Sequence, residues 1–217
     1  MKKFYILNFI YAFCVFPLTA QLMSVESSAF TANDIQFESS ELKIALSQDI
    51  DGLMSKVIKW RHHLHEYPEL GNREFKTSKY IADILNNLGL EVNTGIAYTG
   101  ITAYIRGEHS GPLIALRADI DALPVTELTN LPYASKETTM YQGNKVGVMH
   151  ACGHDAHVAV MLGVADFLSR NTDKLHGDIL LIFQPAEEGP PEGEEGGAEL
   201  MLKEGIFNEK PDVVFGM

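Results

Sequence analysis

The densest group of reactive side chains in this 217-residue sequence lies between His150 and His157. This short segment carries a thiol, three imidazoles and a carboxylate, a combination that few structural needs explain. Thiolate and imidazole together suit a borderline metal such as zinc, manganese, cobalt or nickel. In an extended segment residues two apart point to the same side, so Cys152 and His154 could share one metal while Gly153 lets the backbone turn. A histidine-rich helix start with a buried cysteine is the competing interpretation.

Two adjacent carboxylates, Glu187 and Glu188, follow an apolar run that predicts a strand. Loops at the carboxyl end of such strands commonly build the site of an α/β fold. Because the two side chains diverge from a common backbone, one can bind a metal while the other faces the attacking water, as a metallohydrolase requires. The alternative is a solvated acidic loop, which is how we interpret the glutamates just downstream at 192, 194 and 195.

A third polar segment, residues 117–124, also follows an apolar run. Asp119 and Asp121 would project to one face there. They are candidates for groups that orient metal ligands. Turn-forming aspartates before Pro124 are the alternative interpretation.

The elements that must position these segments alternate between helical and strand-like patterns. Apolar residues at helical spacing predict a helix over residues 41–66, with Gly52 as a candidate break, and another over 75–88. Residues 123–146 indicate a long excursion over the surface. The remaining elements are short and bounded by turn residues: strands at 90–93, 101–105, 113–116, 179–183 and 213–215, and helices at 156–170 and 198–203. This alternation predicts an α/β fold with a mixed, partly parallel sheet flanked by helices.

The amino-terminal end predicts export to the periplasm or the exterior. Two lysines precede a mostly apolar run over residues 4–18, and small residues follow at 19 and 20. This pattern is typical of a cleaved signal peptide over residues 1–20, followed by a polar linker over 21–40 and a folded domain over 41–217. An uncleaved membrane anchor is the alternative, although the run is shorter than the ~20 residues of a spanning helix. The mature chain then keeps one cysteine, Cys152, which cannot form an internal disulfide.

Composition restricts the class of partner. The chain has 29 acidic and 17 basic residues and a formal net charge of -12. Nucleic acids and anionic membranes both require a basic face, so we expect neither as a partner of the mature chain. A hydrophobic content of 46% allows a substantial core, as in a folded soluble domain.

Four motifs in this order resemble the M20 metallopeptidase family, in particular the amidohydrolase branch that contains hippurate hydrolases and plant auxin-conjugate hydrolases. Three are the segments above, and the fourth is Trp60-Arg61-His62-His63-Leu64-His65 followed by Pro68-Glu69-Leu70-Gly71 and Glu74. The resemblance covers about residues 50–217. It implies a zinc-peptidase-like catalytic domain, in which we interpret the histidines of the fourth motif as packing and capping groups.

The resemblance also implies roles for individual residues. Three match metal ligands, namely Cys152, His154 and Glu188. Glu187 matches the general base, and Asp121 matches an aspartate that orients a ligand. The implied cofactors are two divalent metal ions, manganese or zinc, with cobalt or nickel as alternatives. The implied reaction is hydrolysis of the amide bond of a small N-acyl amino acid.

Related chains continue beyond the equivalent of residues 213–217 with a histidine ligand, a smaller lid domain used for dimer contacts, and a further histidine ligand. We therefore expect the amino-terminal part of a catalytic domain, truncated before the lid and dimerisation domain. Three interpretations stay open. In the first, the parent is an N-acyl amino acid amidohydrolase and a homodimer at full length, and whether this truncated chain is itself active or inactive stays open. In the second, the parent is a metallo-exopeptidase acting on short peptides. In the third, the chain is a non-catalytic remnant.

Overall fold

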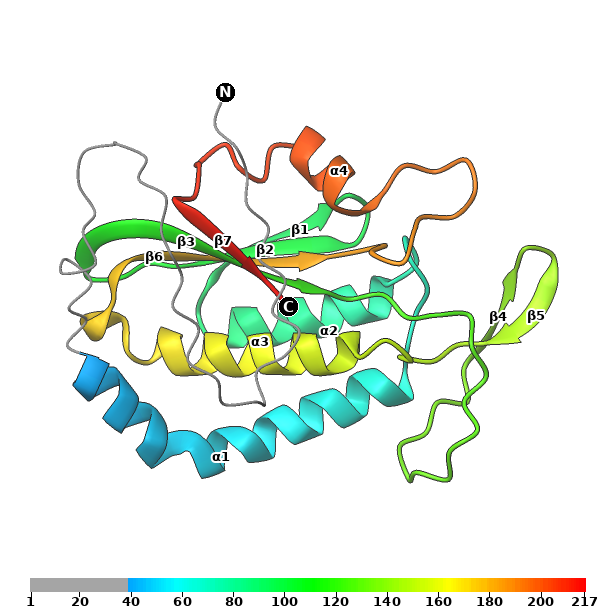
Figure 1. The fold of residues 1–217 in the computed structure, drawn as a ribbon, viewed down its shortest axis with the longest axis horizontal. Coiled ribbons are helices and arrows are strands. Elements are labelled where there is room, and N and C mark those ends of the chain that lie inside the picture. The colour runs from blue at the N-terminus through cyan, green and yellow to red at the C-terminus, as the bar shows by residue number, and fades with distance from the viewer. Residues whose placement is uncertain (1–38) are drawn as a thin grey trace, which may run out of the picture.

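The computed structural model describes residues 39–217. The predicted signal peptide and nearly all of the predicted linker lie outside the described residues and stay predictions. A mixed sheet forms the centre of the fold, with helices on both of its faces (Figure 1). Within residues 39–217, no helix is both long enough and apolar enough to cross a membrane.

The central sheet has five strands in the order β1-β2-β6-β3-β7. β3 pairs in parallel with both β6 and β7, whereas β2 pairs antiparallel with β1 and β6. The strands are β1 (Glu91–Ile96), β2 (Gly100–Ile105), β3 (His109–Asp119), β6 (His176–Gln184) and β7 (Val213–Gly216). The predicted α/β fold with a mixed, partly parallel sheet is therefore confirmed.

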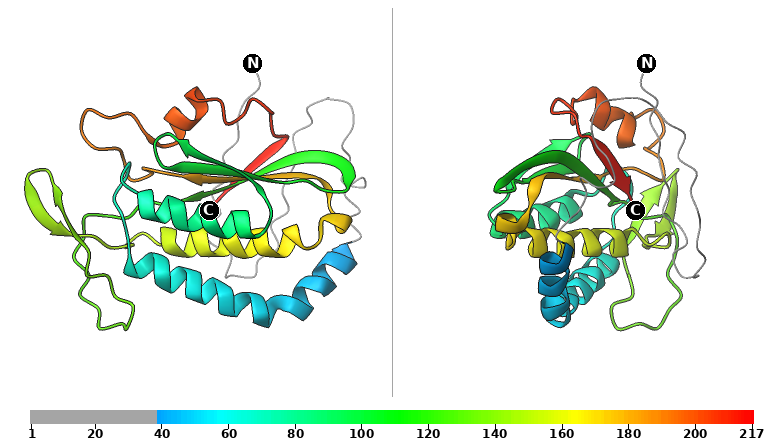
Figure 2. Two further views of the ribbon diagram at one scale, coloured as in Figure 1. Left: turned by 180° about the vertical axis from the view of Figure 1, so that it is seen from behind. Right: turned by 60° about the vertical axis from the view of Figure 1, so that its left-hand side comes forward.

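The helices form layers around this sheet. They are α1 (Ser39–Glu66), α2 (Phe75–Asn87), α3 (His154–Ser169), α4 (Gly197–Lys203) and a short 3-10 helix, η1 (Thr172–Lys174). Figure 2 shows α2 and α3 against one face, α1 outside them, and α4 on the opposite face. The predicted break at Gly52 is wrong, because α1 is one continuous helix. A single interior glycine costs only about 1 kcal/mol, which packing along α3 offsets.

Two apolar clusters bury the faces of the sheet. The larger cluster lies between the sheet and α2 and α3, and it includes Ile81, Leu162 and Phe183, all fully buried. The smaller lies under α4, where Met201 contacts the other face. Ion pairs join α1 to α3, with Lys56 Nζ 2.6 Å from Asp166 Oδ2. Both clusters contain residues of β3 and β6, so these two strands lie at the centre of the core.

The surface excursion contains a hairpin that the sequence pattern did not predict. β4 (Thr138–Tyr141) and β5 (Asn144–Gly147) pair antiparallel and project from the side of the domain (Figure 1). Gln142 and Gly143, both with positive φ, form the turn between the two strands. β4 is exposed along its whole length, so it lacks the apolar alternation that indicates a strand.

Candidate metal centre

The three segments that carry the candidate site residues meet at the carboxyl edge of the two central parallel strands. In the β3–β6 ladder, Asp119 pairs with Gln184, the last residue of each strand. The segment after β3 and the segment after β6 therefore leave the sheet side by side. α3, whose first residue is His154, starts next to them (Figure 1). This is the edge at which α/β sheets commonly carry their sites.

A thiol, an imidazole and a carboxylate converge at this edge. One ligand atom each from Cys152, His154 and Glu188 lies within 4.8 Å of the other two. Cys152 is exposed and His154 is buried, so the group is open to solvent on one side. The donor set matches that of zinc and other borderline ions in proteins. These residues therefore fit a metal ion.

The local turn differs from the extended segment that we expected. His154 is the first residue of α3, and Gly153 before it has φ 105°. A residue with a Cβ rarely adopts this left-handed conformation, so the glycine lets the chain turn into the helix directly after Cys152. The prediction that Gly153 turns the backbone is confirmed, whereas an extended geometry through His154 is wrong.

Three carboxylates surround one nitrogen of His154. Nε2 lies 3.5 Å from Asp119 Oδ1, 3.6 Å from Glu187 Oε2 and 3.8 Å from Glu188 Oε1. A hydrogen bond to Glu188, burial and nearby negative charge raise the pKa of the Cys152 thiol to about 11. So much negative charge at one point attracts a cation.

Asp121 fixes the orientation of the His154 ring. Nδ1 of His154 donates to the main-chain oxygen of Asp121 at 2.9 Å, and Asp121 Oδ1 lies 3.3 Å from the same nitrogen. This contact leaves Nε2 facing the carboxylates. Burial lowers the pKa of His154, but the hydrogen bond to Asp121 and the neighbouring charges outweigh burial and raise it.

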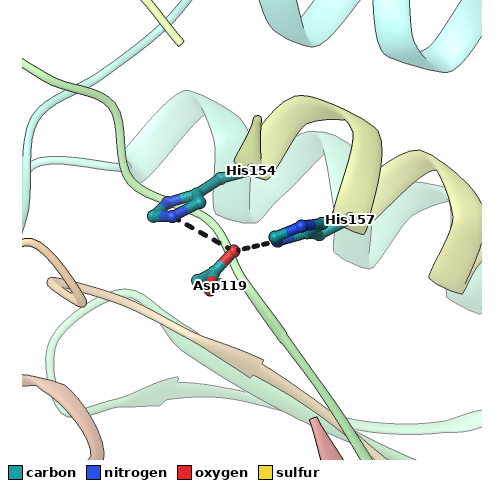
Figure 3. A group of neighbouring side chains, drawn as sticks. All are labelled: Asp119, His154 and His157. Carbon is teal, nitrogen blue, oxygen red and sulfur yellow. Dashed lines mark hydrogen bonds and ion pairs between the residues drawn. The ribbon is translucent and has the colours of Figure 1, made fainter. Parts of the chain in front are cut away.

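Asp119 and His157 form a second group with His154 (Figure 3). Asp119 Oδ1 accepts a hydrogen bond from His157 Nδ1 at 2.8 Å, and Asp119 Oδ2 accepts one from Arg117 at 2.8 Å. Burial opposes ionisation of Asp119, yet these partners hold its pKa below the usual value. The sequence pattern gave His157 no role. Its three-residue spacing from His154 on one helix was the signal, since residues at that spacing share a face.

The acidic pair lies in the loop after β6. Glu187 is 38% exposed, and its Oε1 lies 3.9 Å from Arg117 Nη2. The main-chain amide of Glu188 donates to Asp121 Oδ2 at 3.0 Å. The carboxylates of both glutamates approach His154, but only Glu188 belongs to the group with Cys152. The structure thus brings together every residue singled out for the site.

The histidines at the end of α1 lie outside both of these groups. His62 stacks on Tyr133 and His63 stacks on Tyr80. His65 Nδ1 lies 2.9 Å from Asp155 Oδ2, next to the first turn of α3. These rings pack α1 against its neighbours.

His150, for which the sequence pattern gave no role, is buried behind the site. Among residues 39–217, neither of its ring nitrogens has a hydrogen-bond partner. Burial lowers the pKa of His150 to about 4, which keeps the ring neutral. The residue therefore adds no charge to the acidic site.

The sequence of this chain is similar to those of known hydrolases. Residues 115–217 match the family described as Peptidase family M20/M25/M40. Thermostable carboxypeptidase 1 of Saccharolobus solfataricus is 46% identical over 173 residues, which cover 79% of this chain and 41% of the relative. Hippurate hydrolase of Campylobacter jejuni is 43% identical over 169 residues, covering 77% and 39% respectively.

A solved structure from the same family is also similar to this chain. The Bacillus subtilis YXEP protein, described as a dinuclear metal binding peptidase from the M20 family, has 41% sequence identity and a TM-score of 0.67. The match covers 77% of this chain and 43% of that protein. The chain thus spans about two-fifths of the length of the relatives it matches. Its fold, its cluster of candidate metal ligands and these similarities identify residues 115–217 as part of a domain of peptidase family M20/M25/M40.

Proposed function

We propose that this chain supplies the metal centre and general base of an enzyme that hydrolyses the amide bond of N-acyl amino acids. The observation that carries the proposal is the convergence of Cys152, His154 and Glu188 within 4.8 Å, with Glu187 beside them. The similarity to a hippurate hydrolase supports the substrate class, because hippurate is itself an N-acyl amino acid.

Cys152, His154 and Glu188 would hold a divalent ion, and Asp121 would orient two of these ligands. Manganese and zinc are the ions we propose, two per site, and the donor set also admits cobalt and nickel. Bound ions supply a lowered pKa for water and polarisation of the scissile carbonyl. The description of the YXEP protein as dinuclear supports a pair of ions.

Glu187 would act as the general base. Its carboxylate reaches the same His154 nitrogen as the ligand Glu188 but remains partly exposed, so it is open to water and substrate. It would take a proton from the attacking water and deliver it to the leaving nitrogen. Arg117 lies 3.9 Å away and places positive charge beside Glu187.

A metallo-exopeptidase acting on short peptides is the second candidate. The 46% identity to a thermostable carboxypeptidase favours it, since that name describes release of a terminal residue. For either substrate we propose an exported enzyme, periplasmic or secreted, whose full-length form is a homodimer. The signal-like sequence over residues 1–20 supports export.

Parallel assays of hippurate and of an unblocked dipeptide test the proposal. The purified protein is assayed with added manganese or zinc, then with excess chelator, then with metal restored. We expect hippurate to be cleaved faster than the dipeptide and cleavage to stop with chelator. Faster cleavage of the dipeptide would favour the exopeptidase, and no cleavage of either would contradict both candidates for this chain.

A further inference from the structure

A buried carboxylate in the fourth sequence motif contacts the loop that carries the acidic pair. Glu74 precedes the first turn of α2 and has no exposed surface. Its Oε1 accepts a hydrogen bond from the main-chain amide of Ala186 at 2.9 Å, and its Oε2 accepts one from Thr99 Oγ1 at 2.6 Å. A side chain far away in the sequence therefore holds the residue directly before Glu187.

The backbone of Ala186 needs such support. Its φ is +47°, a left-handed conformation that non-glycine residues adopt rarely and that persists only where the surroundings enforce it. Two residues later, Asp121 Oδ2 accepts the amide of Glu188. Two buried carboxylates thus hold the main chain on either side of Glu187, which sets the direction in which Glu187 and Glu188 leave the backbone.

The segment around Glu74 packs closely against the same loop. A Cβ on Gly71 would lie 2.9 Å from the main-chain oxygen of Gly189 and 3.1 Å from Cα of Ala186, so only glycine fits there without displacement. Asn72 Nδ2 donates to the main-chain oxygen of Glu195 at 2.9 Å. Residues 71–74 therefore contact the loop near both of its ends.

We propose that Glu74 is a positioning residue, whose carboxyl group holds the amide of Ala186 so that Glu187 and Glu188 face the metal centre. The roles of Glu187 and Glu188 rest on the proposed function, whereas the placement of the loop does not. Burial raises the pKa of Glu74 to about 7, but Oε1 accepts the amide of Ala186 in either protonation state. The hydrogen bond therefore does not require the charge.

Glu74→Met, Glu74→Gln and a matched control, Glu69→Met, test this proposal. Glu69 lies in the same motif, and its carboxylate accepts hydrogen bonds from the amide and hydroxyl of Thr77 in α2 but none from the loop. Methionine keeps the length of glutamate without an acceptor, and glutamine keeps an acceptor for Ala186. Residue-resolved hydrogen exchange is measured for residues 184–190, together with titration by manganese alone.

We expect faster exchange in this loop and roughly 10- to 100-fold weaker manganese binding in Glu74→Met, the range for lost groups that orient metal ligands. Glu74→Gln and Glu69→Met should keep the loop exchange of the wild type. A Glu74→Met loop as protected as in the wild type would overturn the proposal. If Glu74→Met does not fold, hydrogen exchange of the wild-type protein provides the test. Exchange of the Ala186 amide at the rate of an exposed group would also overturn the proposal.

The exchange comparison needs neither metal nor turnover. An inactive wild type with a loop that depends on Glu74 would contradict the proposed function alone. An active wild type in which Glu74→Met leaves hydrogen exchange of the loop unchanged would contradict the positioning role alone.

Discussion

The main-chain amide of Glu188 donates a hydrogen bond to Oδ2 of Asp121 at 3.0 Å. The same aspartate accepts the Nδ1 hydrogen of His154 through its main-chain oxygen. Asp121 therefore connects two proposed ligands that lie on different segments of the chain. Residues that orient ligands in this way contribute to the affinity of a metal site.

Replacing Asp121 by alanine removes the acceptor for the amide of Glu188. We expect metal affinity to fall by roughly 10- to 100-fold, measured by calorimetric titration with zinc or manganese. Asp83→Ala is the control, because Asp83 is exposed and, within the described part of the chain, pairs only with Lys79 on α2. Equal affinity in the two variants would remove Asp121 from the support of the site.

Cys152→Ser tests the thiol as a ligand. Serine keeps the size of the side chain but replaces the soft sulfur donor, so we expect the protein to bind zinc more weakly while remaining folded. Cys152 is exposed, so its substitution should leave the melting temperature of the metal-free protein nearly unchanged. Zinc binding as tight as in the wild type would exclude Cys152 from the centre.

Stability should depend on pH through Glu74. Burial raises the pKa of Glu74 from 4.5 to about 7, with the charge of Asp121 adding to the effect. Folding therefore favours the protonated form, and this contribution is fully present below about pH 4.5 and is lost as the pH rises through about 7.

Glu74→Gln removes this dependence. Between about pH 4 and about pH 8, we expect the unfolding free energy of the variant to gain roughly 3 kcal/mol relative to the wild type. Urea unfolding at several pH values measures the difference, and Glu69→Gln provides the control. A difference between variant and wild type that is constant with pH would contradict the raised pKa.

The apolar cluster between the sheet and α3 should dominate stability. Leu162 is fully buried in it, so Leu162→Ala should lower the unfolding free energy by roughly 2–5 kcal/mol. Leu128 is 90% exposed, and Leu128→Ala should change it by less than about 0.5 kcal/mol. Urea denaturation of both variants compares them, and equal losses would contradict this position of the core.

The sequence predicted the helices and strands whose apolar spacing matches their packing in the core. The helix predicted over 75–88 is α2, and the run at 179–183 is the centre of β6. The β4–β5 hairpin was missed because most of its residues are exposed and carry no apolar period. The start of α3 was placed two residues late, since a left-handed glycine rather than a polar cap begins that helix.

The site was predictable as a set of motifs but not as a set of contacts. The sequence analysis singled out Cys152, His154 and the acidic pair, and the structure brings these side chains together. The bond between Glu74 and Ala186 joins positions 112 residues apart, which no local pattern indicates. The contact of His157 with Asp119 likewise appears only when α3 packs beside the end of β3.

Glu187→Gln provides the most direct test of the account, through metal titration and hippurate hydrolysis of the same preparation. Glutamine keeps the size of the side chain but cannot take a proton from water. We predict metal binding like that of the wild type, with turnover reduced by roughly 100- to 10,000-fold. A variant that binds metal and hydrolyses hippurate at the wild-type rate would contradict the assignment of Glu187 as the general base.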